Sequence, residues 1–194
     1  MFKSWEIRGS DPCLVINSFD PGVTTGWSIH RIPIKELVSE GFKASIHCES
    51  FCWNSGEIYK FRKENQTIAD MLKVSRFAWS LAEEENGDVF VIILEDFILD
   101  TLDSSRDLLS PVRINAKFDY AMKDSGICIV MQLASEAMWT VTDARLKSWG
   151  LYKAGLQHAR DAQRHAILFA RKYASKVDLR NKIDAYNHNG HGAH

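Results

Sequence analysis

The chain has 194 residues, of which 45% are hydrophobic and 25% are charged, and its formal net charge at pH 7 is −1. This length and composition are typical of a globular protein with a buried core, and no apolar run approaches the roughly 20 residues that a membrane-spanning helix needs. The total charge excludes a uniformly basic protein, but the distribution is uneven. Residues 1–105 hold 10 basic and 17 acidic side chains, whereas residues 106–180 hold 13 basic and 7 acidic ones. This asymmetry suits a protein that binds divalent metal with one part and a polyanion with another.

The two ends of the chain give expectations about domains and location. Residues 1–12 contain no apolar segment of the kind found in secretory signals, which favours a cytoplasmic protein without membrane contact. The four cysteines lack the spacing of a zinc site, so we expect reduced thiols. We expect one domain over residues 1–180. The remaining residues, 181–194, are of low complexity and are predicted to form a flexible tail.

The first third of the chain predicts three strands. Residues 13–20 form an apolar run that ends in an acid, which indicates a buried strand. Residues 24–32 and 43–53 are rich in β-branched and aromatic side chains, and they predict two further strands. Together the three strands suggest an antiparallel meander.

The rest of the chain alternates helices with strands. Apolar residues with helical spacing predict a helix over residues 63–86. A continuous apolar run then predicts a central strand over residues 89–95, buried on both faces. The later elements are a helix at 104–124 in which Pro111 marks a break or a first turn, a strand at 127–133, a short basic helix at 141–149 and a long helix at 157–176. This order predicts a mixed α/β domain with helices flanking a central sheet.

An acid ends the first predicted strand. Asp20 is followed by Pro21 and Gly22, which let the backbone turn tightly toward the next strand. A carboxylate at this position points out of the sheet edge instead of into a packed layer. An ordinary Asp-Pro-Gly hairpin turn is the alternative interpretation.

A second acid ends the strand predicted at 89–95. A carboxylate after such an apolar run is costly to bury unless it is paired or bound to metal. Glu95 is favoured over Asp96 because neighbouring residues of a strand point to opposite faces. If this strand lies beside the first one, Asp20 and Glu95 repel each other, and a divalent cation would relieve the repulsion. A purely structural carboxylate is the alternative.

The last long helix carries a His-x-x-Asp pair. His158 and Asp161 are three residues apart and share a helix face, which also includes His165. The adjoining stripe of the helix is apolar and consists of Ala159, Ala162, Ala166, Phe169, Ala170 and Tyr173. The pair therefore lies at the edge of the buried face, within reach of the sheet. A solvated polar face is the alternative.

The combination of Asp20, Glu95, His158 and Asp161 is more specific than any one of these motifs. Oxygen-rich ligands with a single imidazole favour Mg²⁺ or Mn²⁺ over structural zinc. Four such ligands fit a two-metal phosphodiesterase, in which one ion activates the attacking water and the other stabilises the leaving oxygen. The sequence therefore predicts a catalytic site with two Mg²⁺ (or Mn²⁺) ions.

These motifs resemble those of the RuvC-type Holliday junction resolvases, particularly their bacteriophage relatives, in the RNase H-like superfamily. That family has a strand ending in Asp-x-Gly before glycine and hydroxyl residues, as in residues 20–27 here. Its fourth strand ends in a catalytic Glu, as at Glu95, and its last helix carries an acid or His three residues before an Asp, as at His158 and Asp161. The resemblance extends over roughly residues 13–175. It implies an RNase H-like fold with a five-stranded mixed sheet, three antiparallel strands followed by two parallel ones, flanked by helices.

The resemblance also implies a substrate and an assembly. A homodimer with two active sites would nick opposed strands of a four-way DNA junction, whose near two-fold symmetry it matches. The products would carry 5′-phosphate and 3′-hydroxyl ends, as in DNA recombination and repair, and a phage-encoded protein would act in the host cytoplasm. The cations expected to contact DNA lie in the basic second half of the chain and are Arg106, Arg113, Lys117, Arg145, Lys147, Lys153, Arg160 and Arg164.

Three alternatives remain open at the level of sequence. Asp-x-Gly-x-Thr also opens the phosphate loop of sugar kinases and actin-like ATPases, but those proteins need a second such loop, and this chain has none. A non-catalytic module could bind branched DNA without cutting it, although all four ligand positions hold ligand-competent residues. A nuclease for flaps, forks or RNA–DNA hybrids would share the same site, because enzymes that recognise shape need no short motif.

Overall fold

The computed structural model describes residues 11–39, 52–59, 64–82, 86–97 and 106–190. Its strands are β1 (Cys13–Asp20), β2 (Thr25–Pro33), β3 (Cys52–Ile58), β4 (Val89–Asp96) and β5 (Cys128–Leu133). Its helices are α1 (Ile34–Ser39), α2 (Glu64–Trp79), α3 (Arg106–Met122), α4 (Ala134–Thr140), α5 (Asp143–Ser148), α6 (Gln157–Ser175) and α7 (Val177–Gly190).

The five strands form one mixed sheet in the order β3-β2-β1-β4-β5. β1 pairs antiparallel with β2, and β2 pairs antiparallel with β3. β4 lies parallel to β1 on the other side, and β5 lies parallel to β4. The predicted fold class is confirmed, with three antiparallel strands followed by two parallel ones. Every residue of β1 is buried, as expected for a central strand covered on both faces.

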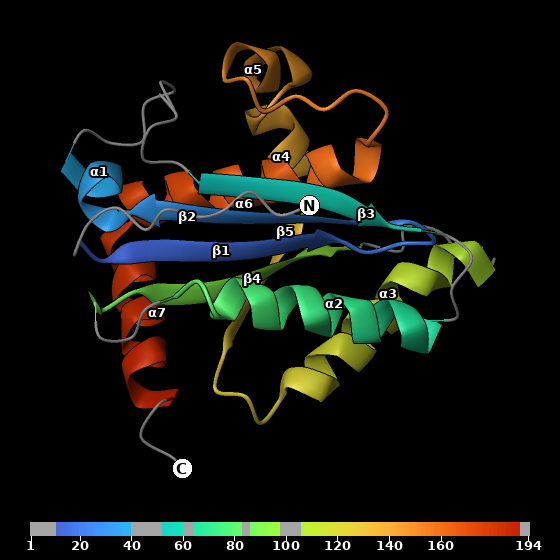
Figure 1. Ribbon diagram of the computed structural model, residues 1–194, viewed down its shortest axis with the longest axis horizontal. Coiled ribbons are helices and arrows are strands. Elements are labelled where there is room, and N and C mark those ends of the chain that lie inside the picture. The colour runs from blue at the N-terminus through green and yellow to red at the C-terminus, as the bar shows by residue number, and fades with distance from the viewer. Residues whose placement is uncertain (1–10, 40–51, 60–63, 83–85, 98–105, 191–194) are drawn as a thin grey trace.

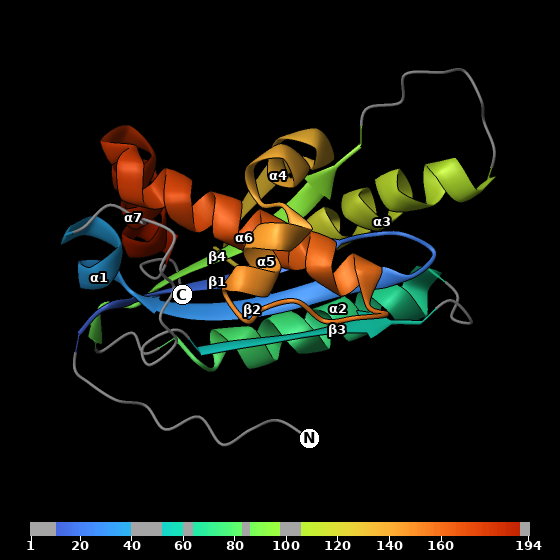
Figure 2. The ribbon, with the colours of Figure 1, turned by 90° about the horizontal axis from the view of Figure 1, so that it is seen from above.

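Helices cover both faces of the sheet (Figures 1 and 2). Alternate β1 residues such as Leu14 and Ile16 join one core cluster with α6 and α7, whereas Val15 and Phe19 join a second cluster with α2 and α3. This follows from strand geometry, because successive side chains point to opposite faces. The three-layer arrangement fixes which side chains of each strand can meet α6.

The same alternation places the two strand-end acids. Asp20 has the parity of Leu14 and Ile16 in β1, so it lies on the face covered by α6. Glu95 has the parity of Val91 and Ile93 in β4 and lies on that face too. Because β1 and β4 are adjacent and parallel, their carboxyl ends meet at the same edge of the sheet.

Several elements differ from the sequence-based predictions. The strand predicted at 43–53 falls mostly outside the described residues, and β3 instead runs over Cys52–Ile58. The short helices α1 and α4 carry too few residues to show a clear apolar period. Pro111 lies within α3 and does not end it. Over the described part of the chain, no helix is both long enough and apolar enough to cross a membrane.

The prediction of a flexible tail over residues 181–194 is corrected as far as Gly190, where α7 ends. Ile183 is buried against the core, and the Asn187 side chain accepts a hydrogen bond from the Phe90 backbone N–H at 3.2 Å. The low-complexity composition of this segment gave no indication that Ile183 is buried or that the Asn187 side chain bonds to the start of β4. Residues 191–194 lie outside the described part.

Candidate metal-binding active site

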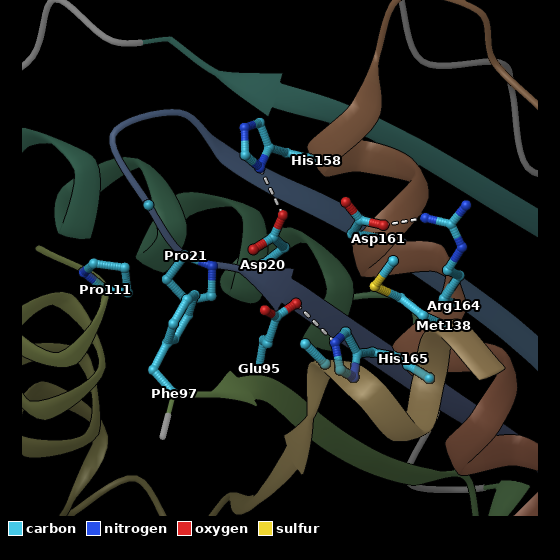
Figure 3. A pocket seen from close by; sticks show the side chains of 13 residues that line it. Asp20, Pro21, Glu95, Phe97, Pro111, Met138, His158, Asp161, Arg164 and His165 are labelled. Atoms are coloured by element: carbon cyan, nitrogen blue, oxygen red, sulfur yellow. Dashed lines mark hydrogen bonds and ion pairs between the residues drawn. The ribbon is translucent and has the colours of Figure 1, made fainter. Parts of the chain in front are cut away.

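A cavity of about 270 Å³ opens where the carboxyl ends of β1 and β4 meet α6 (Figure 3). All four predicted ligands line it: Asp20 from β1, Glu95 from β4, and His158 and Asp161 from α6. Pro111 of α3 and Met138 of α4 form other parts of the wall. The structure therefore brings together side chains that are far apart in the sequence, with 141 positions between Asp20 and Asp161.

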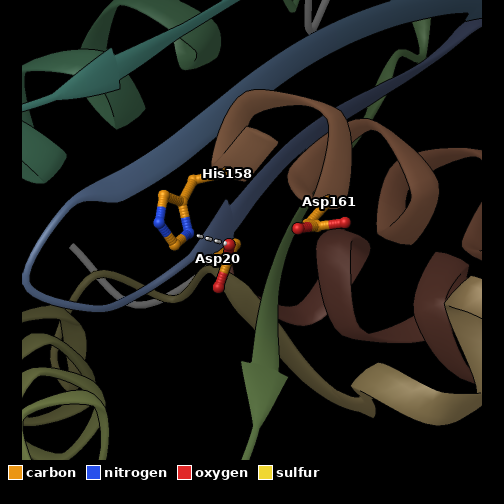
Figure 4. Close-up of side chains that lie close together, drawn as sticks. All are labelled: Asp20, His158 and Asp161. Carbon is orange, nitrogen blue, oxygen red and sulfur yellow. Dashed lines mark hydrogen bonds and ion pairs between the residues drawn. The ribbon is translucent and has the colours of Figure 1, made fainter. Parts of the chain in front are cut away.

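Asp20, His158 and Asp161 form the closest group (Figure 4). One ligand atom from each lies within 4.8 Å of the others, a spacing that a single cation can bridge. His158 Nδ1 and Asp20 Oδ2 are 2.7 Å apart. Asp20 is buried, whereas the His158 side chain is 40% exposed to the cavity. Two carboxylates and one imidazole fit Mg²⁺ or Mn²⁺, so this group can hold a metal ion.

Burial and mutual contact shift the pKa values of the three side chains in this group. Burial raises the pKa of Asp20 to about 6, and the nearby Glu95 charge acts in the same direction. Burial likewise raises the pKa of Asp161. The hydrogen bond with Asp20 raises the pKa of His158. Burial sets the sign of the shift for both acids, and repulsion from nearby carboxylates acts in the same direction.

The first turn of α6 is held against the sheet by close contacts. A Cβ atom on Gly26 in β2 would lie only 2.0 Å from the His158 carbonyl oxygen, so only glycine lets the helix approach this closely. Ser18 Oγ donates to the Ala162 carbonyl at 2.6 Å. On the other side, the His158 backbone N–H donates to Glu57 Oε1 of β3 at 3.0 Å, which satisfies one of the free N–H groups of the helix start.

The comparisons with known proteins bear on this geometry. No family model matches the chain, and no curated protein matches its sequence. Among solved structures, it is similar to Thermus thermophilus RuvC in complex with a Holliday junction substrate, with a TM-score of 0.56, 9% identity, and coverage of 84% of this chain and 97% of that one. A second structure of Thermus thermophilus RuvC gives a TM-score of 0.53 and 11% identity, and covers 87% of this chain and 97% of that one.

The fold is RuvC-like. At these low identities the similarity establishes the RNase H-like architecture and not the activity. Within this RuvC-like fold, the cluster of acids sits at the end of the central parallel strand pair, because β1 and β4 both carry an acid there. The assignment of a candidate metal site therefore depends on the positions of Asp20, His158 and Asp161, and the fold explains why these residues meet.

Arg164 is buried beside the site. It was predicted to contact DNA, but its side chain is only 10% exposed and pairs with both Asp161 and Asp143. Its Nε also donates to the Val141 carbonyl at 2.9 Å. The guanidinium therefore orients Asp161 and ties α5 to α6, which leaves it poorly placed for a phosphate.

The other predicted DNA contacts fall into two groups. On α3, Arg113 and Lys117 both pair with Glu64 at the start of α2, at 3.0 and 2.9 Å. This pairing offsets part of their charge. The side chain of Arg106 lies outside the described part.

The second group lies between α5 and α6. Lys147 Nζ and the Arg160 guanidinium carbon lie 4.7 and 4.9 Å from the centre of the Tyr152 ring. Lys153 Nζ donates to the Ser55 carbonyl at 2.9 Å. Arg145 of α5 donates to the carbonyl of Thr140, the last residue of α4. Lys147 and Arg160 thus share the Tyr152 ring, and Arg160 also donates to the Lys153 carbonyl at 2.8 Å, so these three cations form a basic cluster beside the first turn of α6.

Four residues of the site were not chosen as functional from the sequence. Glu57 lay beyond the predicted third strand. Asp143 lay in a helix expected to be basic, and Gln132 lay in a strand that offered no acid. His165 was noted on the same face as Asp161 but was not selected. Only Gln132 and His165 carried a usable signal, since strand parity and helix spacing point both toward the face that Glu95 occupies.

Proposed function

We propose that this chain is a structure-selective endonuclease that cleaves branched DNA, with the four-way junction as its main substrate. The observation that carries the proposal is the convergence of Asp20, Glu95, His158 and Asp161 on one cavity at the carboxyl ends of two parallel strands. The likeness to a RuvC structure that holds a Holliday junction supports the choice of substrate. The proposed reaction is hydrolysis of a phosphodiester bond to 5′-phosphate and 3′-hydroxyl ends.

The residues of the cavity would hold two divalent cations. Mg²⁺ or Mn²⁺ bound here would supply a nucleophilic water and stabilise the leaving oxygen. Asp20 and Asp161 are near enough to share one ion with His158, and Glu95 extends the ligand set on the β4 side. The carboxylates bind as anions, and His158 binds through a nitrogen that carries no proton. Arg164 holds the orientation of Asp161 from outside the ligand set.

We further propose that the described strands and helices, α7 included, form one nuclease domain that works as a homodimer. Two sites related by a two-fold axis would cut opposed strands of a junction together. The basic cluster of Lys147, Lys153 and Arg160 would contact phosphates beside the cavity, because it borders the first turn of α6, and Arg145 would contact them from α5. Arg106, Arg113 and Lys117 would contact a more distant part of the same substrate.

A cleavage panel tests this function. Purified protein is given a four-way junction, a replication fork, a flap, a linear duplex and an RNA–DNA hybrid, each with Mg²⁺ or Mn²⁺ and with a chelator as control. We expect the four-way junction to be cut at least about tenfold faster than linear duplex, because branched DNA presents a deformable shape that duplex lacks. Equal cutting of linear duplex would contradict junction selectivity. Preferential cutting of the hybrid, fork or flap would show that this nucleic acid, and not the junction, is the main substrate.

Metal binding should depend on pH with a predictable sign. Because the Asp20 pKa is about 6 and the His158 pKa is raised, protons compete with the cation below these values. We expect Mn²⁺ affinity, measured by calorimetry, to rise with pH between 5 and 7, by about tenfold per pH unit for each proton that the cation displaces. The Asp178→Asn variant, altered at an exposed position of α7 outside the cavity, should keep the same profile. An affinity that does not change between pH 5 and 7 would contradict the ligand assignment.

A further inference from the structure

Glu95 has a buried partner that the proposed ligand set does not include. His165 Nε2 lies 2.9 Å from Glu95 Oε2 (Figure 3). His165 is only 1% exposed and Glu95 is 7% exposed, so water cannot readily replace this contact. His158, in contrast, has a side chain that is 40% exposed to the cavity. The two histidines of α6 therefore occupy different environments although they are seven residues apart.

The second nitrogen of His165 is also engaged. Its Nδ1 lies 3.1 Å from Gln132 Oε1 on β5, and Gln132 is paired directly with Glu95 in the sheet register. Gln132, His165 and Glu95 thus form a buried chain that joins β5, α6 and β4. In the described part of the molecule, Gln132 Nε2 has no hydrogen-bond partner.

The contact with Gln132 determines which nitrogen of the His165 ring faces Glu95. With the amide as placed, Gln132 Oε1 accepts from Nδ1; with the amide rotated, the otherwise unpartnered Nε2 donates to Nδ1 instead. In both cases an ionised Glu95 can be hydrogen-bonded only if His165 Nε2 carries a proton and donates it. That N–H occupies Glu95 Oε2. The other carboxylate oxygen, Oε1, points away from His165 (Figure 3).

We propose that His165, supported by Gln132, is a positioning residue: it holds Glu95 so that only Oε1 is available to bind a metal ion. This inference rests on the proposed metal-dependent function and deepens it. His165 is not itself a ligand, because both of its ring nitrogens are already engaged by protein groups. It also lies outside the close group of Asp20, His158 and Asp161. Partners of this kind set the orientation and basicity of the ligands that they contact.

The test measures Mn²⁺ binding to the full chain by calorimetry in three variants. His165→Ala should weaken the affinity for Mn²⁺ by about 10- to 100-fold with unchanged stoichiometry. His165→Gln, whose side-chain amide can still donate to Glu95, should recover most of the loss. Gln132→Leu should have a smaller effect in the same direction. His158→Ala is the matched comparison, since removal of a ligand should instead reduce the number of ions bound.

Each outcome decides the matter. Loss of one bound ion in His165→Ala would make His165 a ligand, and unchanged affinity would make its contact purely structural. If the alanine variant fails to fold, as judged by circular dichroism, the wild-type protein crystallised with Mn²⁺ gives the answer. There, Glu95 should bind Mn²⁺ through Oε1 alone with His165 still on Oε2, and a His165–Mn²⁺ bond or absence of Mn²⁺ would overturn the proposal. Failure to cut branched DNA, with Mn²⁺ binding intact, would overturn only the proposed function.

Discussion

Replacement of Asp20, Glu95 or Asp161 by its neutral amide is expected to lower the rate of junction cleavage by about 10³-fold or more. An amide cannot supply the negative charge that holds a divalent cation in this cavity, and metal ions contribute several kcal/mol to such reactions. Junction binding should persist, because the contacts proposed for DNA lie on α3, on α5 and at the start of α6. The measurement is single-turnover cleavage of a labelled junction, with binding followed by gel shift.

The fold itself should tolerate the change at Asp20. Burial raises the pKa of this carboxyl to about 6, above its usual value, so ionised Asp20 destabilises the folded state at pH 7. That destabilisation is relieved as the pH falls through 6 toward 4, where the carboxyl takes up a proton in the folded state before it does so in the unfolded chain. Asp20→Asn should therefore melt at an equal or higher temperature than wild type while losing activity.

The neighbouring acid provides the matched control. Asp96 follows Glu95 directly but is exposed and points to the opposite face of β4. Asp96→Asn should keep near-wild-type cleavage. Near-wild-type cleavage by any one of the three site variants would remove that residue from the ligand set, and an inactive Asp96→Asn variant would contradict the assignment by strand parity.

The second large effect is expected from a single methyl group at Gly26. A Cβ atom there would lie 2.0 Å from the His158 carbonyl oxygen and 2.7 Å from the Ala159 nitrogen. These are backbone atoms, so no side-chain rotation can relieve the clash. Gly26→Ala should therefore push the first turn of α6 away from β2 and lower the free energy of unfolding by about 3 kcal/mol or more. Any folded fraction should also bind Mn²⁺ more weakly, because His158 and Asp161 would move away from Asp20.

Urea unfolding and calorimetry of the same sample test this prediction. Gly22→Ala, in the turn just before β2, is the control, since its Cβ would meet only the Thr24 carbonyl oxygen, at 3.1 Å. We expect that variant to lose less than about 1 kcal/mol. A Gly26→Ala protein as stable as wild type would show that α6 does not pack directly on β2 as described.

The sheet and its two acids could be predicted from the sequence because their signals are local. Asp20 and Glu95 each end an apolar run, and alternation along a strand determines the face on which each lies. The side of α6 that meets the sheet was equally visible, since its small residues recur with helical spacing. These patterns, together with the motif resemblance, were sufficient for the topology and for the four side chains that the cavity brings together.

What the sequence could not show depends on pairs of distant residues. Arg164 looks like a phosphate ligand in isolation, and only the positions of Asp143 and Asp161 reveal that it is buried between them. Likewise, the role of His165 depends on the register that sets Gln132 beside Glu95. The α7 helix was missed because one buried side chain, Ile183, anchors a segment of polar composition. Such pairings are set by tertiary packing, and periodicity shows only the face on which each residue lies.

The central claim is that the carboxylates of β1, β4 and α6 hold divalent metal for catalysis. The most direct measurement is an anomalous-difference map from crystals of the wild-type chain soaked in MnCl₂. We predict two peaks in the cavity. One should lie between Asp20, His158 and Asp161, and the other should lie on the β4 side, within reach of Glu95. An empty cavity at saturating Mn²⁺, or peaks only at other acids, would contradict the account.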